Sequence, residues 1–170
     1  EKLKLIPPCG NFTDIPKDSP PYVKGMISHV YRRLHPDKPS TTIIAAGGGG
    51  IPVVRNEDGS LTGKEAVIDK DLAAALMAKE LKADLFVIST AVEKVSLNFG
   101  RPEQIDLDTI TLEECQKYVD EGHFAPGSML PKVQAMMDFV KSTGNVGLIT
   151  NPENIYDSLY HGKGTKIVVK

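Results

Sequence analysis

Short apolar runs alternate with helical patterns along most of this chain, and this alternation limits its fold more than any other feature. Leu85 to Thr90 is a continuous apolar run closed by two hydroxyl residues, which is typical of a parallel strand buried on both faces. Ala73, Leu76 and Leu81 share one face of a helix that we predict from Val67 to Lys82. The alternation predicts an α/β fold, with a mainly parallel sheet between two helical layers.

The other predicted elements continue this order. Thr111 and Glu114 form a capping-box pattern at the start of one helix, and a turn is expected at 57–60. The polar connection 91–108 has some hairpin character. We expect helices at about 21–35, 111–120, 132–141 and 152–160, and strands at 41–46, 51–54, 146–150 and 166–169. Ligands of such sheets bind beyond the carboxyl ends of strands, so the loops after Ala46 and Thr90 are the informative ones.

The charge balance and the cysteines exclude several classes of protein. Lys and Arg number 20 against 22 for Asp and Glu, giving a net charge of −2, so nucleic acid and membrane surfaces are not expected partners. No apolar stretch approaches the roughly 18 residues of a membrane span, and Glu1 opens a charged segment without an apolar leader. Cys9 and Cys115 cannot make a disulfide framework, which favours two unpaired thiols in the cytoplasm.

A run of four glycines at 47–50 follows the strand predicted at 41–46. Glycine lets the backbone approach a ligand closely, and exposed N–H groups in such loops suit phosphate or carboxylate oxygens. The run is neither a dinucleotide-binding fingerprint nor a phosphate-binding loop of the GK[ST] type. A plain tight turn is the alternative.

The residues Asp69, Lys70 and Asp71 stand at the mouth of the helix predicted from Val67. The carboxylates suit the positive end of the helix dipole, so capping by Asp69 or Asp71 is the simple interpretation. Lys70 is mildly disfavoured there, which suggests that it faces an anion outside the helix. The alternative is an ordinary solvated lysine.

The segment GHFAPGSMLPK at 122–132 is the most distinctive in the chain. Gly and Pro fix the loop, and we place its end at Pro131, with Lys132 at the start of the next helix. A rigid loop that brings a lysine and several N–H groups to a helix start suits the phosphates of a nucleotide, although an ordinary helix connection would also explain it. The four histidines show no zinc-ligand spacing, and no GxSxG element is present.

Several of these segments together resemble the carbamate kinases of the amino acid kinase family. The matching stretches are AAGGGGIPVV at 45–54, EAVIDKDLAAALMAKELKADLFVIST at 65–90, VEKVSLNFG at 92–100, EGHFAPGSMLPKV at 121–133 and GTKI at 164–167. The resemblance covers about residues 41–170 in the family's order. It implies a three-layer αβα sandwich of the amino acid kinase type and a cytoplasmic kinase that moves a phosphoryl group between ATP and carbamate.

The resemblance also implies roles for individual residues. Lys70 and Lys132 would contact phosphates, and Asp71 would orient them. The nucleotide, ATP or ADP with magnesium, would be bound by Thr90, Val92, Val95, Phe99, Gly127, Ser128 and Met129. Of these, the segments around Thr90 to Val95, Phe99 and Met129 would bound the adenine and ribose. Gly48, Gly49 and Gly50 would lie near the acceptor and the transferred phosphoryl group. No metal ligand is expected in the chain, since magnesium would be bridged chiefly by phosphate oxygens.

One departure from the family bears on activity. The family's amino-terminal glycine loop of the form LGGNA is absent, so we do not expect the isolated chain to catalyse turnover unaided. We expect a lead-in at 1–40 with one helix and a nucleotide-binding domain at 41–170. A homodimer, or association with a separate amino-terminal half, is also expected. The alternatives are another acyl-phosphate kinase of the superfamily and a truncated nucleotide-binding module without catalysis.

Overall fold

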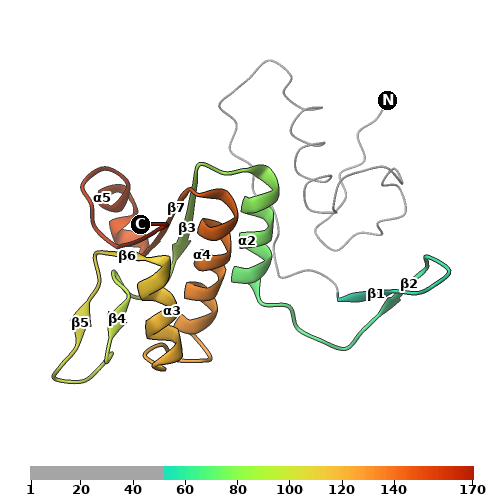
Figure 1. Cartoon of the computed structure of the whole chain (residues 1–170), viewed down its shortest axis with the longest axis horizontal. Coiled ribbons are helices and arrows are strands. Elements are labelled where there is room, and N and C mark those ends of the chain that lie inside the picture. The colour runs from blue at the N-terminus through green and yellow to red at the C-terminus, as the bar shows by residue number, and fades with distance from the viewer. Residues whose placement is uncertain (1–51) are drawn as a thin grey trace, which may run out of the picture. The chain divides into compact units, whose positions relative to one another are not determined.

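The computed structural model describes residues 52–170 (Figure 1). The chain divides into two compact units with their boundary between Leu81 and Lys82, and each is described here by itself. The helix predicted at 21–35, the strand predicted at 41–46 and the glycine run at 47–50 lie outside the described residues. Among residues 52–170, no helix is both long enough and apolar enough to cross a membrane.

The first unit contributes a hairpin and a helix. Strands β1 (Val53–Arg55) and β2 (Leu61–Gly63) pair antiparallel across the predicted turn. Helix α2 spans Lys70–Leu81, so it begins three residues later than we predicted. The reason is a cap: Asp69 Oδ1 accepts hydrogen bonds from the backbone N–H groups of Asp71 (2.7 Å) and Leu72 (3.3 Å). Capping by Asp69 is therefore confirmed.

The second unit is built on a four-stranded sheet within the described residues, in the order β3-β7-β8-β6. These strands are β3 (Leu85–Ser89), β7 (Val146–Thr150), β8 (Thr165–Val168) and β6 (Thr109–Thr111). The β3–β7 and β6–β8 pairs are parallel, and the β7–β8 pair is antiparallel. The predicted α/β fold with a mainly parallel sheet is confirmed.

Burial alternates along β3, which differs from the prediction of a strand buried on both faces. Phe86 and Ile88 are buried, whereas Leu85 and Ser89 are exposed. Among the described residues β3 pairs with β7 and with no second neighbour. The apolar run therefore does not by itself show how a strand is placed in the sheet, because the residue types do not report which side of a strand has a neighbour.

Two helices pack near the sheet. Helix α3 (Leu112–Asp120) begins at the predicted capping box, in which the Thr111 hydroxyl accepts from the Glu114 N–H and the Glu114 carboxylate accepts from the Thr111 N–H. Helix α4 (Met129–Thr143) begins three residues before the predicted start. Pro131 lies inside its first turn, where a missing N–H costs no helical hydrogen bond.

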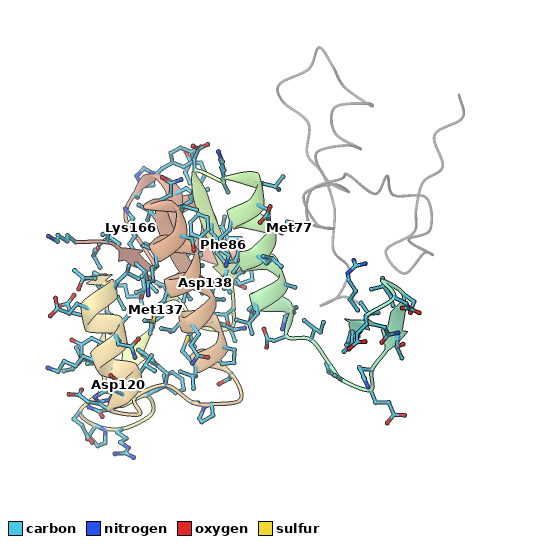
Figure 2. The ribbon with its side chains drawn as sticks, turned by 45° about the vertical axis from the view of Figure 1, so that its right-hand side comes forward. Met77, Phe86, Asp120, Met137, Asp138 and Lys166 are labelled. Atoms are coloured by element: carbon cyan, nitrogen blue, oxygen red, sulfur yellow. The ribbon has the colours of Figure 1, made fainter. Side chains whose placement is uncertain are left out.

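The core of the second unit lies between α4 and the sheet. Val133, Met136, Phe139 and Val140 of α4 are fully buried, and the rings of Phe139 and Phe86 have centroids 5.4 Å apart. Phe86 is labelled in Figure 2, as is Asp138, which lies on the exposed face of α4.

Two further pairs of elements complete the unit. A small hairpin of β4 (Ser96–Leu97) and β5 (Ile105–Asp106) confirms the predicted hairpin character of 91–108. A 3-10 turn, η2 (Pro152–Asn154), leads into helix α5 (Ile155–Tyr160), close to the predicted helix.

The parallel β3–β7 pair is fastened at both ends. Before the strands, the Asn145 side-chain amide donates to the Ala83 carbonyl at 2.9 Å. After them, the Thr90 N–H donates to the Thr150 carbonyl at 2.8 Å. The register of the two strands is thereby set at each end by a hydrogen bond.

Candidate active site

The carboxyl ends of β3 and β7 lie at the same edge of the sheet, because the two strands are parallel and in register. Helix α4 runs opposite to β7, since Gly144 and Asn145 are the only residues between them. The start of α4 at Met129 therefore lies at the same end of the unit (Figure 1). This end is the place where open α/β sheets bind ligands.

The loop 90–95 leaves β3 at this end. Thr90 and Val92 are half-buried, and Val95 is fully buried. The Val95 N–H donates to the Thr165 hydroxyl at 2.8 Å, and the same hydroxyl donates to the Leu107 carbonyl. The loop is therefore anchored to β8 through a side chain.

A chain of polar side chains links loop 90–95 to the segment after β7. The Asn154 amide donates to the Glu93 carboxylate at 3.1 Å, and Lys163 Nζ donates to the Asn154 amide oxygen at 2.9 Å. Lys163 also pairs with Asp157 at 3.1 Å. The loop after β3 is thus tied to the loops that follow β7 and precede β8.

The start of α4 carries four of the predicted site residues. Gly127 and Ser128 are exposed, whereas Met129 and Lys132 are half-buried. Ser128 is the N-cap residue, but its side chain makes no capping hydrogen bond. Lys132 lies in the first turn, so a cation and the N–H groups of a helix start occur together, as the prediction requires.

Phe99 lies in the turn between β4 and β5 and is 65% exposed. Below it, the Ser96 hydroxyl donates to the Asp106 carboxylate at 2.7 Å, and the Gln104 amide donates to the same carboxylate at 2.8 Å. Both hydrogen bonds lower the pKa of Asp106, and the bond from the Ser96 hydroxyl has the larger effect. The hairpin that carries Phe99 is therefore held by side-chain hydrogen bonds on its polar face.

Lys70 and Asp71 belong to the first unit. Lys70 is exposed and is the first residue of α2, and Asp71, the second, is only 7% exposed. The structure brings Thr90, Val92, Val95 and the start of α4 to one end of the second unit. The predicted acceptor residues Gly48, Gly49 and Gly50 lie outside the described residues.

Sequence reasoning missed the residues that hold the site loop, namely Asn154, Lys163 and Thr165. Thr165 stands in the GTKI segment, but a threonine at the start of a strand is so common that its type carries no signal. Residues 52–170 contain no group of three or more His, Cys, Asp and Glu side chains that could hold a metal ion.

Comparisons with known proteins agree with this geometry. Residues 26–151 match the sequence profile of the Amino acid kinase family. Carbamate kinase of Thermoplasma volcanium is 54% identical over 125 residues, which are 74% of this chain and 41% of that protein. The carbamate kinase-like protein YahI of Escherichia coli is 48% identical over 126 residues, which are 74% of this chain and 40% of that protein.

Solved structures give the same result. Carbamate kinase from Giardia lamblia, bound to AMP-PNP, superposes with a TM-score of 0.78 and 36% identity, over 88% of this chain and 50% of that one. The chain spans about 40% of the length of the curated relatives that it matches. Because the family profile covers well over half of its residues, the chain belongs to the amino acid kinase family.

Proposed function

We propose that this chain is the nucleotide-binding part of a phosphotransferase of the carbamate kinase type. Its substrates would be ATP or ADP on one side and carbamate or carbamoyl phosphate on the other. The observation that carries the proposal is the start of α4, where Lys132 lies in the first turn beside an N-cap residue without a capping bond. That turn stands at the carboxyl edge of the sheet, and the Giardia lamblia relative is bound to AMP-PNP.

The chemistry of phosphoryl transfer accounts for the residue types. The transition state is loose and in line, with its charge on the equatorial phosphate oxygens, so catalysis consists mainly of positioning and positive charge. Lys70 and Lys132 would supply that charge, and Asp71 would orient them. The loop 90–95 with Phe99, Gly127, Ser128 and Met129 would bound the nucleotide, and the glycines 48–50 would lie near the acceptor.

Magnesium fits this proposal without a carboxylate cage. Mg²⁺ keeps several waters and binds chiefly through phosphate oxygens in nucleotide sites. The absence of a cluster of metal-ligating side chains among residues 52–170 is therefore compatible with it. Bound there, the ion would neutralise phosphate charge, while the lysines orient the same phosphates.

The first test is calorimetric titration of the chain with ADP, comparing Lys132→Ala with Lys141→Ala as the matched control. Both lysines lie on α4, but Lys141 is in its last turn and exposed. Loss of one charge-assisted hydrogen bond should weaken ADP binding by about 10- to 100-fold in Lys132→Ala. Lys141→Ala should bind like the wild type. A wild type that does not bind ADP, or equal binding by both variants, would contradict the proposal.

A second candidate is a nucleotide-binding module that transfers no phosphoryl group. The groups at the start of α4 suit the phosphates of a nucleotide whether or not an acceptor is bound. Incubation of the chain with ADP and carbamoyl phosphate, followed by ATP measurement with luciferase, separates the two. ATP formed from carbamoyl phosphate supports the kinase, and ATP formed only from an amino acid acyl phosphate indicates another kinase of the superfamily. Tight ADP binding without ATP formation supports the module.

We further propose that the chain associates with a second copy or with a complementary amino-terminal half, in the cytoplasm. The support is strand β3, for which residues 52–170 supply one neighbour, β7. A strand edge that stays unpaired is a template for another strand. Sedimentation equilibrium tests this: a concentration-independent monomer would contradict self-association.

A further inference from the structure

The hydroxyl of Thr165 occupies a place that a backbone hydrogen bond would normally fill. The β4–β5 hairpin pairs Ser96 with Asp106 and Leu97 with Ile105, so the next pair is Val95 with Leu107. The Leu107 N–H donates to the Val95 carbonyl at 2.8 Å, as a ladder requires. The return bond, from the Val95 N–H to the Leu107 carbonyl, is replaced by the Thr165 hydroxyl.

That hydroxyl accepts the Val95 N–H at 2.8 Å and donates to the Leu107 carbonyl. Thr165 and Val95 are both fully buried, so the Val95 N–H does not have water as an alternative partner. A residue of β8, 70 positions along the chain from Val95, thereby closes the base of the hairpin. The buried hydroxyl thus gives both the Val95 N–H and the Leu107 carbonyl a hydrogen-bond partner. Without the hydroxyl, these two backbone groups would lack partners or would have to bond each other directly.

The inserted hydroxyl also defines where the loop 90–95 runs. The loop starts at Thr90, whose N–H is bonded to the Thr150 carbonyl of β7, and ends at Val95 on Thr165 of β8. Its two ends are thus fixed to neighbouring strands, and Glu93 between them is held by Asn154. The path of this short loop is determined at both ends and at one point between them.

We propose that Thr165 is a positioning residue, which holds loop 90–95 in the path that receives the nucleoside part of the nucleotide. The inference rests on the proposed function, because it assigns this loop to nucleotide binding. Thr165 itself acts through Val95 and Leu107 and need not contact the ligand. The phosphate-contacting groups at the start of α4 belong to a different element and do not depend on the hydroxyl.

The test compares two ligands on the full chain by calorimetry. ADP reports on nucleoside and phosphates together, and inorganic tripolyphosphate reports on the phosphates alone. Thr165→Val keeps the shape of the side chain and removes the hydroxyl, whereas Thr165→Ser restores it. Ser158→Ala is the matched structural control, because Ser158 is also buried but its hydroxyl bonds the side-chain hydroxyl of Thr150 at 2.7 Å and not a backbone group of the loop.

Thr165→Val should lose about tenfold or more in ADP affinity and keep its tripolyphosphate affinity. Thr165→Ser and Ser158→Ala should bind both ligands like the wild type. ADP binding by folded Thr165→Val within twofold of the wild type overturns the proposal, as does an equal loss for both ligands. A wild type that binds neither ligand refutes the proposed function, whereas a binding wild type with an unaffected variant refutes this inference alone.

A second variant keeps the test decisive if Thr165→Val fails to fold. Asn154→Ala removes the hold on Glu93 from a half-buried position outside the core. It should lower ADP affinity and leave tripolyphosphate affinity unchanged, by the same argument. Unchanged ADP affinity in this variant would overturn the view that the fixed path of the loop matters for the nucleoside.

Discussion

At the scale of single residues, the start of β8 depends on Gly164 having no side chain. The φ of Gly164 is +76°, a left-handed conformation that residues other than glycine adopt at a cost in free energy. A Cβ at this position would lie 2.8 Å from the Ile149 carbonyl oxygen, which is backbone and cannot turn away. Gly164 therefore permits β8 to begin directly beside β7.

Gly164→Ala should destabilise the protein more than Gly162→Ala. Both glycines have positive φ, but a Cβ on Gly162 meets nothing within 4 Å. We expect about 1 kcal/mol for the conformational cost in Gly162→Ala, and a further loss of about 1–3 kcal/mol from overpacking in Gly164→Ala. Urea denaturation measures both. Equal urea midpoints for the two variants would show that the Ile149 carbonyl can move aside at no cost in free energy.

The residue scale also shows what sequence reasoning can find. Asp69 and the Thr111–Glu114 pair were predictable, because a cap is a local interaction between residues two or three apart. Thr165 was not, since its two partners lie in segments that only the fold brings together. For Lys70 and Lys132, local physics suggested only contact with an anion, and the resemblance supplied the phosphate-contacting roles, which remain to be tested by mutation.

At the scale of elements, helix α3 carries its own start signal. The Thr111 hydroxyl accepts the Glu114 N–H, and the Glu114 carboxylate accepts the Thr111 N–H at 2.8 Å. Hydrogen bonds from the Thr111 backbone N–H and from the Thr111 hydroxyl lower the pKa of Glu114, and the backbone bond has the larger effect. The helix start is therefore stabilised by the charged form of one carboxylate.

Thr111→Ala should lower the free energy of unfolding by about 1 kcal/mol, because the N-cap side chain is lost. The measurement is urea denaturation at neutral pH. Ser142→Ala, at an exposed position near the end of α4, is the control for removing a hydroxyl from a helix without a cap. A loss as large in Ser142→Ala would mean that the cap contributes nothing.

The stability contributed by the Glu114 charge should depend on pH. The folded pKa lies below the usual value of 4.5, so the contribution is present above that value and is lost as the pH falls below it. Glu114→Gln should be less stable than the wild type at pH 7, and the difference should shrink as the pH falls below about 4.5. A difference independent of pH would show that the charge plays no part.

Element boundaries explain the remaining differences between prediction and structure. β7 was predicted with its observed bounds, because five apolar or small residues stand between a helix end and a proline. β2 and β6 were missed, since three residues are too few for a periodic pattern. Helix α4 begins earlier than the sequence predicts because Pro131, which indicates the end of a loop, also fits a first helical turn.

At the scale of the whole molecule, the buried Cys115 reports on the integrity of the second unit. Burial raises the pKa of its thiol to about 12, and the side chain is fully inaccessible. The thiolate is the reactive form, so the native thiol is protected both by protonation and by exclusion of reagents.

In a Cys9→Ser variant, iodoacetamide at pH 8 should leave Cys115 unmodified in the native protein and modify it in urea. Intact-mass spectrometry at increasing urea concentrations then follows opening of the second unit. The modification midpoint should coincide with that of circular dichroism, as expected for a cooperative unit. Rapid alkylation without urea would contradict the burial of this residue.

The hydrogen bonds at the two ends of the β3–β7 pair have a consequence for binding. Parallel strands joined by a long crossover could slide past one another, and a slip by one residue would turn every side chain to the opposite face. Here a slip would break the Asn145–Ala83 bond at one end and the Thr90–Thr150 bond at the other. The register of these two strands at the ligand-binding end of the second unit is consequently fixed when the chain folds, before a small molecule binds. A ligand therefore spends no binding free energy on ordering them.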